Sequence, residues 1–302
     1  MLRAMLTFIQ VLVSGLAIGC VYGLVALSFV LVYKAAETVS FMQGELLMVG
    51  AFAVVALQAA GWPLAAALAG GVAGAALLGA VLERTVLRHV LGQSAMGQPA
   101  MGQSHLSAVL LTFGLGLMLR GGVTAAPAAS HGMFTLPLPW ADEVFRLGPL
   151  SLPGGQLLVM AATALVAAAL TLFFRYSRSG LALRACAEDA RSAALMGVPV
   201  ARMHTLAWAL GAALAALAGV LLAPITFVHL NMGFIALKAF PAAVLGGLTS
   251  LPGALAGGVF LGVVEALAGL VLPEGTKDVV PYLLLLAALL LFPAGFGARR
   301  TA

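Results

Sequence analysis

The sequence predicts an all-α protein, a polytopic bundle of about eight to ten transmembrane helices. Hydrophobic residues make up 63% of the 302 residues and charged residues only 8%, whereas an ordinary soluble domain is about a quarter charged. The mean hydropathy of +1.12 agrees. A chain with so few charges cannot cover a water-facing surface, so the composition excludes a peripheral protein or one held by a single anchor.

The positions of the charges divide the chain into spans, because a charge in the hydrocarbon core is costly and charges therefore mark helix ends. The first uncharged stretch is too long for a signal-peptide core and is interpreted as a retained first span. The predicted spans cover residues 6–32, 46–60, 62–82, 106–125, 155–174, 204–223, 234–247, 253–272 and 279–292.

Two of these spans are unusual. The spans 46–60 and 234–247 are short, and Pro241 is predicted to interrupt the second. Short segments broken by Gly or Pro are typical of re-entrant or discontinuous helices near a translocation path. An ordinary span that is tilted or kinked is the alternative.

Lys and Arg in alternate loops predict the orientation, since basic residues concentrate on the cytoplasmic side. One side holds Lys34, Arg84, Arg88, Arg175, Arg178, Arg184, Arg191, Arg202, Arg299 and Arg300. The other holds Arg3, Arg146 and Lys277, with Arg120 and Lys238 near helix ends. The count places the loop 175–203 and the C-terminus in the cytoplasm and the N-terminus outside. The net charge of +5 is interpreted as this bias, and no basic patch with exposed aromatic residues indicates a nucleic-acid partner.

Glycines recur at a spacing of four on two spans. Small residues four apart allow helix backbones to approach closely where no hydrophobic force drives their association. The pattern predicts a tightly packed bundle. The glycines concerned are Gly15, Gly19 and Gly23 on the first span and Gly253, Gly257, Gly258 and Gly262 on the eighth.

Several kinds of chemistry are missing from the sequence. There is no G-x-x-x-x-G-K-[ST] motif, so the chain has no P-loop for ATP. It also has no H-E-x-x-H motif, Cys/His cluster or G-x-S-x-G motif, and no intramembrane chain of Asp, Glu and His for a proton relay. We expect a non-enzymatic chain without a cofactor or metal of its own. A membrane enzyme is the alternative, because the loop 127–154 contains His131, Asp142 and Glu143. That loop is rich in Pro and Gly and is interpreted as a solvated connection.

Two carboxylates lie in or beside apolar runs. Glu45 follows Gly44 at the start of a span, where the positive end of the helix dipole favours a negative charge. Contact with a substrate is the alternative for Glu45. Glu265 lies about two thirds of the way along its span, where a carboxylate should face the interior of the bundle. A structural contact between helices and a role in a translocation path are both open for Glu265.

The basic loop contains an Ala-rich segment, 184–199, which predicts a helix of about three turns bounded by Gly180 and by Gly197 with Pro199. Arg184, Glu188 and Arg191 share one face of this helix, and another face holds Leu183, Ala187, Ala190 and Ala194. A short helix of this kind is suited to the groove of a partner. A linker lying on the membrane surface is the alternative, but alanine is a weak membrane anchor.

The same segment resembles the cytoplasmic coupling loop of ABC-importer permeases, in which an Ala-Glu pair is followed about nine residues later by Gly. Here these positions are Ala187, Glu188 and Gly197. The sequences RACAED at 184–189 and LMGV at 195–198 are similar to the version found in branched-chain amino acid permeases. The resemblance implies that Arg184, Ala187, Glu188, Asp189 and Gly197 couple the chain to an ATPase.

Further segments carry the same resemblance over nearly the whole chain. Residues 22–27 and 40–52 are similar to the first-span region and the N-F-A-H-G-E region of the family. Residues 238–258, with Gly262, Glu265 and 277–278, resemble the C-terminal signature of the family and are the most specific match.

The chain also departs from the family pattern. Ser40, Met42 and Gln43 stand where Asn, Ala and His are usual, and Lys34 replaces a common Gly. If these positions tune the path, the substrate differs from leucine, isoleucine or valine. Gln43, Glu45 and Glu265 are therefore the candidate residues of a translocation path or gate.

The resemblance implies one transmembrane permease domain over residues 1–302, with a coupling loop at 175–203 and an outer loop at 127–154. It implies a multi-pass protein of the bacterial inner membrane that moves branched-chain or related amino acids. The implied partners are two cytoplasmic ATPase subunits that bind the ATP, a second related permease forming a heterodimer, and an external solute-binding protein. An ion-coupled secondary transporter or channel for a small polar solute is the alternative.

Overall fold

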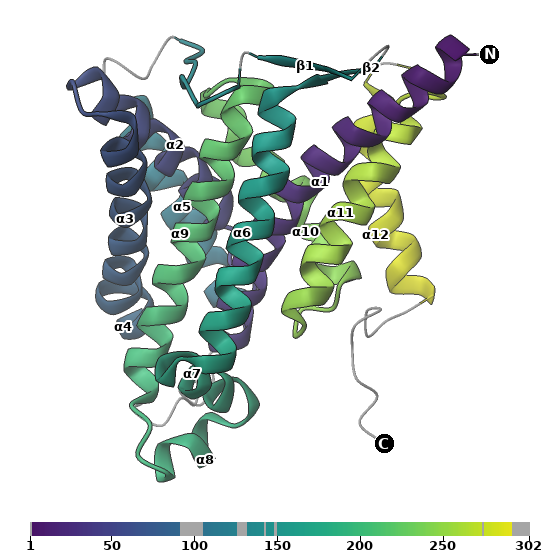
Figure 1. Ribbon diagram of the computed structural model, residues 1–302. Coiled ribbons are helices and arrows are strands. Elements are labelled where there is room, and N and C mark those ends of the chain that lie inside the picture. The colour runs from purple at the N-terminus through teal and green to yellow at the C-terminus, as the bar shows by residue number, and fades with distance from the viewer. Residues whose placement is uncertain are drawn as a thin grey trace.

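The computed structural model describes residues 2–90, 105–125, 132–141, 143–147, 150–273 and 275–291. Most of these residues are helical, and the long helices run side by side as a bundle (Figure 1). Six helices are long and apolar enough to cross a membrane, and two further apolar helices are shorter. The predicted all-α polytopic bundle is confirmed.

Each predicted span corresponds to a helix, and the ends differ from prediction by at most four residues. A π-helical turn, η1 (Glu83–Leu87), joins α3 to α4, and two 3-10 turns, η2 (Leu230–Met232) and η3 (Thr276–Val279), precede α10 and α12. The helices are α1 (Leu2–Ala36), α2 (Gln43–Ala59), α3 (Leu64–Leu82), α4 (Arg88–Val90), α5 (His105–Thr124), α6 (Gly154–Tyr176), α7 (Arg178–Glu188), α8 (Ala190–Leu195), α9 (Val200–Thr226), α10 (Gly233–Leu245), α11 (Leu251–Ala268) and α12 (Val280–Leu291).

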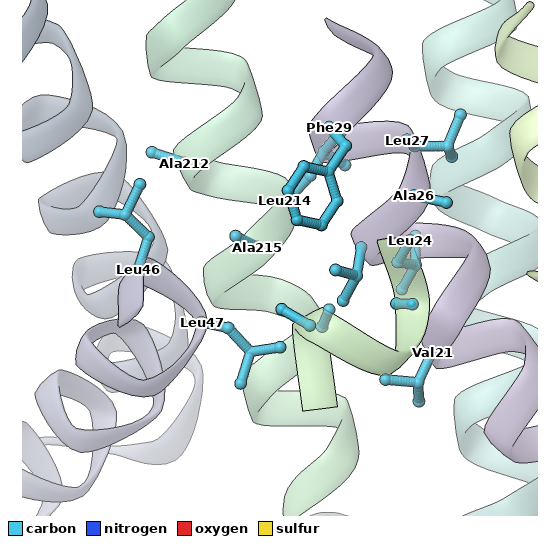
Figure 2. Packing of buried hydrophobic residues seen from close by; sticks show 14 of the residues in the cluster. Val21, Leu24, Ala26, Leu27, Phe29, Leu46, Leu47, Ala212, Leu214 and Ala215 are labelled. Atoms are coloured by element: carbon cyan, nitrogen blue, oxygen red, sulfur yellow. The ribbon is translucent and has the colours of Figure 1, made fainter. Parts of the chain in front are cut away.

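Helix α1 lies at the centre of the bundle. Every residue from Val21 to Val32 is buried, and α1 packs against α9, α10 and α11. Figure 2 shows its side chains, among them Phe29, gathered with Leu47 of α2 and Ala215 of α9. A helix that is apolar on all sides is stable in lipid or among other helices. The small residues of α1, which allow α11 to approach closely, favour its place in the core.

The outer helices leave large apolar side chains uncovered. Leu77 of α3, Leu110 of α5, Leu165 of α6 and Leu290 of α12 are 60 to 76% exposed. Soluble proteins rarely expose contiguous apolar surface of this kind. In a bundle with spans of membrane length, such faces are covered by lipid or by other membrane subunits.

The loops that the charge count assigns to opposite sides lie at opposite ends of the bundle. Helices α7 and α8 are at one end, with the C-terminal end of α1, and the N-terminal end of α1 is at the other (Figure 1). The predicted connection 127–154 contains an antiparallel hairpin of β1 (Val144–Leu147) and β2 (Leu150–Pro153) at that second end. His131, Asp142, Arg299, Arg300 and the C-terminus lie outside the described residues.

Helix α2 begins inside the bundle. Although α1 ends at Ala36, the hydroxyl of Ser28, about 12 Å further back along α1, donates a hydrogen bond of 2.7 Å to Gln43. Residues 37–42 therefore return into the bundle before α2 starts. The start of α10 meets the start of α2, because a Cβ on Gly44 would lie 3.1 Å from the Cβ of Ala236.

Pro241 does not interrupt the short span, contrary to the sequence-based expectation. Helix α10 continues through Pro241 from Gly233 to Leu245. A proline removes one backbone hydrogen bond, but Pro241 is buried between packed neighbours, and tertiary packing holds the helix together. Pro241 is therefore not the reason why this span is short.

The predicted single helix at 184–198 is also wrong, since two helices meet at Asp189. Asp189 is extended, with φ −156° and ψ 103°, and its side chain accepts from the amides of Arg191 and Ser192 at the start of α8. An aspartate that caps a new helix in this way ends the preceding one. Arg191 therefore lies on a different helix from Arg184. The first helix begins at Arg178, so Gly180 lies inside it instead of bounding it.

Close contact between α1 and α11 depends on glycine. A Cβ on Gly19 would lie 2.8 Å from the Cα of Val259, and one on Gly15 would lie 2.7 Å from the Cβ of Ala266. From the other side, Gly258 and Gly262 face the backbone of Gly23 and Gly19. Any added side chain at these positions would push the two helices apart.

We predict that Gly19→Ala lowers the free energy of unfolding by about 1–3 kcal/mol, because the added methyl overpacks the α1–α11 contact. The matched control is Gly74→Ala on α3, where nothing lies within 4 Å of the added Cβ. That substitution should be neutral or stabilising by up to about 1 kcal/mol, from helix propensity. Unfolding of both variants in one detergent measures the difference. Equal effects would contradict the packing argument.

Candidate functional site

Glu45 belongs to a polar cluster between α2, α5 and the start of α10. The guanidinium of Arg120 on α5 lies 3.6 Å from the Glu45 carboxylate. It also donates to the side-chain oxygen of Asn231 at 2.7 Å and lies 4.8 Å from the centre of the Phe234 ring. A Cβ on Gly233 would be only 3.0 Å from a Glu45 oxygen. The carboxylate therefore sits at the first turns of two helices, whose dipoles favour negative charge.

Glu265 lies in a second cluster, between α1, α10, α11 and η3. The hydroxyl of Tyr22 donates to its carboxylate at 2.7 Å, and the ammonium of Lys238 lies 3.6 Å away. Lys238 also pairs with Asp278 in η3. Glu265 is only 8% exposed. A carboxylate inside a membrane bundle is tolerated when it is paired in this way.

Gln43 lies two residues before Glu45 in the first turn of α2, but its side chain faces α1 and α9 instead of the two carboxylates. Its side-chain oxygen accepts from Ser28, and its side-chain nitrogen lies 3.5 Å from the position that a Cβ on Gly211 of α9 would take. That nitrogen is buried and has no hydrogen-bond partner among the described residues. The three residues proposed from the sequence as a path or gate thus occupy three places. Glu45 and Glu265 both contact α10, Glu45 at its first residue, Gly233, and Glu265 near its middle, at Lys238.

A further carboxylate is buried at the end of α3. Glu83, 1% exposed, lies in the π-helical turn η1 and pairs with Arg88 at 2.9 Å. The hydroxyl of Thr205 donates to Glu83 at 2.6 Å, and Arg88 donates to the carbonyl of Ala201 at 2.8 Å. Buried polar networks with all partners satisfied are rigid. This one, the α3–α9 clamp, ties the end of α3 to the first turns of α9, directly after the basic loop.

The segment from α7 to α9 forms the end of the molecule that carries most of the predicted coupling residues. Arg184 and Glu188 are exposed on α7, and Ala187 beside them is half-buried. Hydrogen bonds from the Ser192 hydroxyl and amide, then from the Arg191 amide, hold the pKa of Asp189 below its usual range. The carboxylate therefore remains charged and able to cap α8 at neutral pH.

Two large apolar side chains are exposed at the C-terminal end of α8. Leu195 is 83% exposed and Met196 is 86% exposed. Gly197 follows them with φ +83°, a left-handed conformation that commonly ends helices and favours glycine. We call α7, α8 and residues 196–197 the docking element. Its apolar tip is an exposed surface at the end of the bundle away from the hairpin (Figure 1).

The described residues contain no group of three or more His, Cys, Asp or Glu side chains able to hold a metal ion. Burial raises the pKa of the Cys186 thiol, whereas reactive cysteines have a lowered pKa. The described residues provide ion pairs within the bundle and an exposed contact surface at one end.

The sequence missed the partners of the buried carboxylates. Arg120 was considered only for orientation, Tyr22 and Lys238 entered only as parts of the family resemblance or the charge count, and Glu83 and Thr205 were not singled out. One signal was available: a cation inside an apolar run implies a nearby carboxylate, because an unpaired charge there is costly. Closeness in the sequence could not identify these partners, since Tyr22 and Glu265 are 243 residues apart.

The comparisons with known proteins all indicate the same family. The family model described as "Branched-chain amino acid transport system / permease component" matches residues 11–289. The high-affinity branched-chain amino acid transport system permease protein LivH of Escherichia coli (strain K12) is 34% identical over 312 residues, covering 97% of this chain and 96% of that protein.

Two other relatives are similar over the same extent. LivH of Salmonella typhimurium (strain LT2) is 35% identical over 312 residues. The high-affinity branched-chain amino acid transport system permease protein BraD of Pseudomonas aeruginosa (strain PAO1) is 34% identical over 308 residues. In both comparisons 97% of this chain and 96% of the relative are covered.

We predict that Glu83→Ala lowers the free energy of unfolding by about 3 kcal/mol, because it leaves the Arg88 charge without its buried partner. Removing both charges with Glu83→Leu and Arg88→Leu should restore part of this loss. Arg84→Ala, an exposed cation in the same turn, is the control and should change stability by less than about 0.5 kcal/mol. Chemical unfolding in detergent makes the measurement. A Glu83→Ala variant as stable as the control would overturn the argument.

Proposed function

The chain belongs to the family of branched-chain amino acid transport permeases, and we propose from this premise that it moves branched-chain or related amino acids through the membrane. It is the transmembrane permease subunit of an ABC importer. The observation that carries the proposal is the match over 97% of the chain to permeases of this transport system. The bundle of membrane-length helices supports it.

Two cytoplasmic ATPase subunits would bind the docking element. Its tip offers Leu195 and Met196, both largely exposed, for insertion into an apolar groove of a partner. Arg184 and Glu188 of α7 are exposed beside it and would supply charged contacts. ATP would bind to the partner subunits, and this chain would need no cofactor of its own.

The α3–α9 clamp would transmit the movement of the ATPases into the bundle. The docking element is joined directly to α9, and Glu83 with Arg88 ties the first turns of α9 to α3. A push on the docking element would then move α9 and α3 together. Motions of packed elements as rigid units are the usual basis of gated conformational change.

The translocation path would run along the face formed by α5 and the start of α10. Arg120 is partly exposed there, its side chain 23% accessible, among exposed Leu117, Met118 and Phe234. This face combines a charged pair with apolar side chains, and water or another membrane subunit would contact the charges more favourably than lipid. A second, related permease opposite this face would complete the path, with Glu45 and Arg120 contacting the passing amino acid. Gln43 and Glu265, buried on other sides of the bundle, would act as parts of the gate.

An external solute-binding protein would deliver the substrate to the hairpin end. On this proposal the chain is a multi-pass protein of the bacterial inner membrane, with the docking element in the cytoplasm. The concentration of basic residues in the loop 175–203 supports this orientation. Most of the substrate selectivity would then reside in the binding protein.

We predict that Leu195→Asp with Met196→Asp abolishes ATPase binding, since two charges would replace the apolar tip. The ATPase subunits should fail to copurify with the permease, and uptake into vesicles should fall at least about tenfold, the effect of losing about 1.4 kcal/mol of binding. Met133→Asp, at a side chain that is 74% exposed but outside the docking element, is the control for copurification. Undiminished copurification in the double variant would refute docking through this tip. Loss of copurification with normal uptake would refute ATPase coupling itself.

We predict that Arg120→Gln lowers uptake per folded transporter about tenfold, because a charge-assisted contact worth about 1.5 kcal/mol is lost from the path. ATPase copurification should be retained. Lys277→Gln, an exposed cation of η3, should leave uptake unchanged. If Arg120→Gln lowers the amount of folded protein but not the uptake of the folded fraction, Arg120 is structural and the path lies elsewhere.

A further inference from the structure

A large groove lies between α6 and α11 and is separate from the α5–α10 face. Both helices pack on α1, but they have no extended packing with each other, and residues of α7 line the space between them. The groove has a volume of about 1610 Å³, more than the roughly 300–1,000 Å³ of an ordinary small-molecule site.

The rim of the groove is charged. Lys34 at the end of α1, Arg175 at the end of α6 and Arg184 on α7 all line it, together with Glu37 and Glu188. Within the described ranges, none of the three cations has a carboxylate within 4.0 Å. Three cations against two carboxylates leave the rim with a net positive charge, and none of these described side chains is held in a close ion pair there.

The start of α11 adds to this field. Leu251 and Pro252 line the groove beside the hydroxyl-bearing Thr249, so the positive end of the α11 dipole faces it. Helix starts and cations that converge on one space favour an anionic group, and phosphate in particular.

The interior of the groove is apolar. Leu27 of α1, Leu170 of α6 and Val259 and Phe260 of α11 line it. From Ala167 to Arg175 the wall of α6 rises by about 12 Å, close to the roughly 15 Å depth of one leaflet of the hydrocarbon core. A charged rim above an apolar wall of this depth matches a headgroup and its acyl chains.

We propose that this groove binds an anionic phospholipid from the leaflet at the α7 end of the bundle, with its phosphate on Lys34, Arg175 and Arg184 and its acyl chains along α6 and α11. Phe260 of α11 lines the groove and is 52% exposed, so a lipid can enter from the bilayer. The proposal goes beyond the transport function and does not depend on the solute carried. Because Arg184 belongs to the docking element, the lipid bridges that element to α1 and α6.

Lipid retention by the purified full-length chain tests the proposal. Native mass spectrometry from detergent would compare phosphatidylglycerol with phosphatidylcholine of the same acyl chains, and we expect about a tenfold preference for phosphatidylglycerol. Lys34→Gln and Arg175→Gln should each lower its retention about fivefold. Arg178→Gln, a cation of α7 outside the groove, is the charge control and should retain it fully. Glycerol phosphate without acyl chains should not displace the lipid.

A second pair of variants tests the apolar wall. Ala167→Trp fills the groove, whereas Ala164→Trp, one turn away on α6 and exposed outside the groove, does not. Only the first should reduce lipid retention, and comparable stability of the two variants in detergent excludes misfolding. Equal retention of the two lipids by the unaltered chain, or equal loss in the charge variants and their control, would overturn the proposal.

Photocrosslinking distinguishes a lipid from a protein occupant. A photoreactive phenylalanine analogue at Phe260, in the complete transporter in its membrane, should yield an adduct with the mass of a phospholipid. A crosslink to a second permease or to an ATPase subunit would show that protein covers the groove and would refute the lipid site.

Discussion

Among the residues that the structure describes, each carboxylate enclosed by the bundle lies beside a cation, and the arrangement of the short helices depends on this constraint. Glu45 has Arg120, Glu83 has Arg88, and Glu265 has Lys238. An unpaired charge in hydrocarbon is too costly to keep. Two of the pairs join different helices, α2 with α5 and α10 with α11. Glu83 and Arg88 lie on consecutive turns and together bind α9 through Thr205 and Ala201.

The glycines make this pairing geometrically possible. Because Gly15 and Gly19 let α1 approach α11 closely, the hydroxyl of Tyr22 on α1 reaches Glu265. Gly233 has the same effect at the other cluster, where the start of α10 comes against the carboxylate of Glu45. The small residues allow the backbones to approach closely, and this short distance lets polar and charged side chains of neighbouring helices reach one another.

The charged side chains are distributed differently in the bundle and at its α7–α8 end. Inside the bundle, the charges of Glu83 and Glu265 are buried and paired. At one end, the docking element exposes apolar and charged side chains together, and on the proposed function this surface would contact the ATPase. The groove beside it combines a cationic rim with an apolar wall. A docking surface and a lipid site would then share α7, and the membrane itself would influence coupling.

The sequence by itself determined the fold class, the spans and the family, because hydropathy and charge are local properties and the signature residues are contiguous. It could not decide where the helix at 184–198 breaks. Asp189 interrupts it by capping a new helix with its own side chain, and a window of high helix propensity hides such a turn. Nor could the sequence show that α10 continues through Pro241, which packing alone holds in place. Only the tertiary structure decided that the side chains of Gln43, Glu45 and Glu265 face different neighbours and that Tyr22, Arg120 and Lys238 complete their surroundings. Those contacts join residues up to 243 positions apart, and their formation depends on how closely whole helices pack.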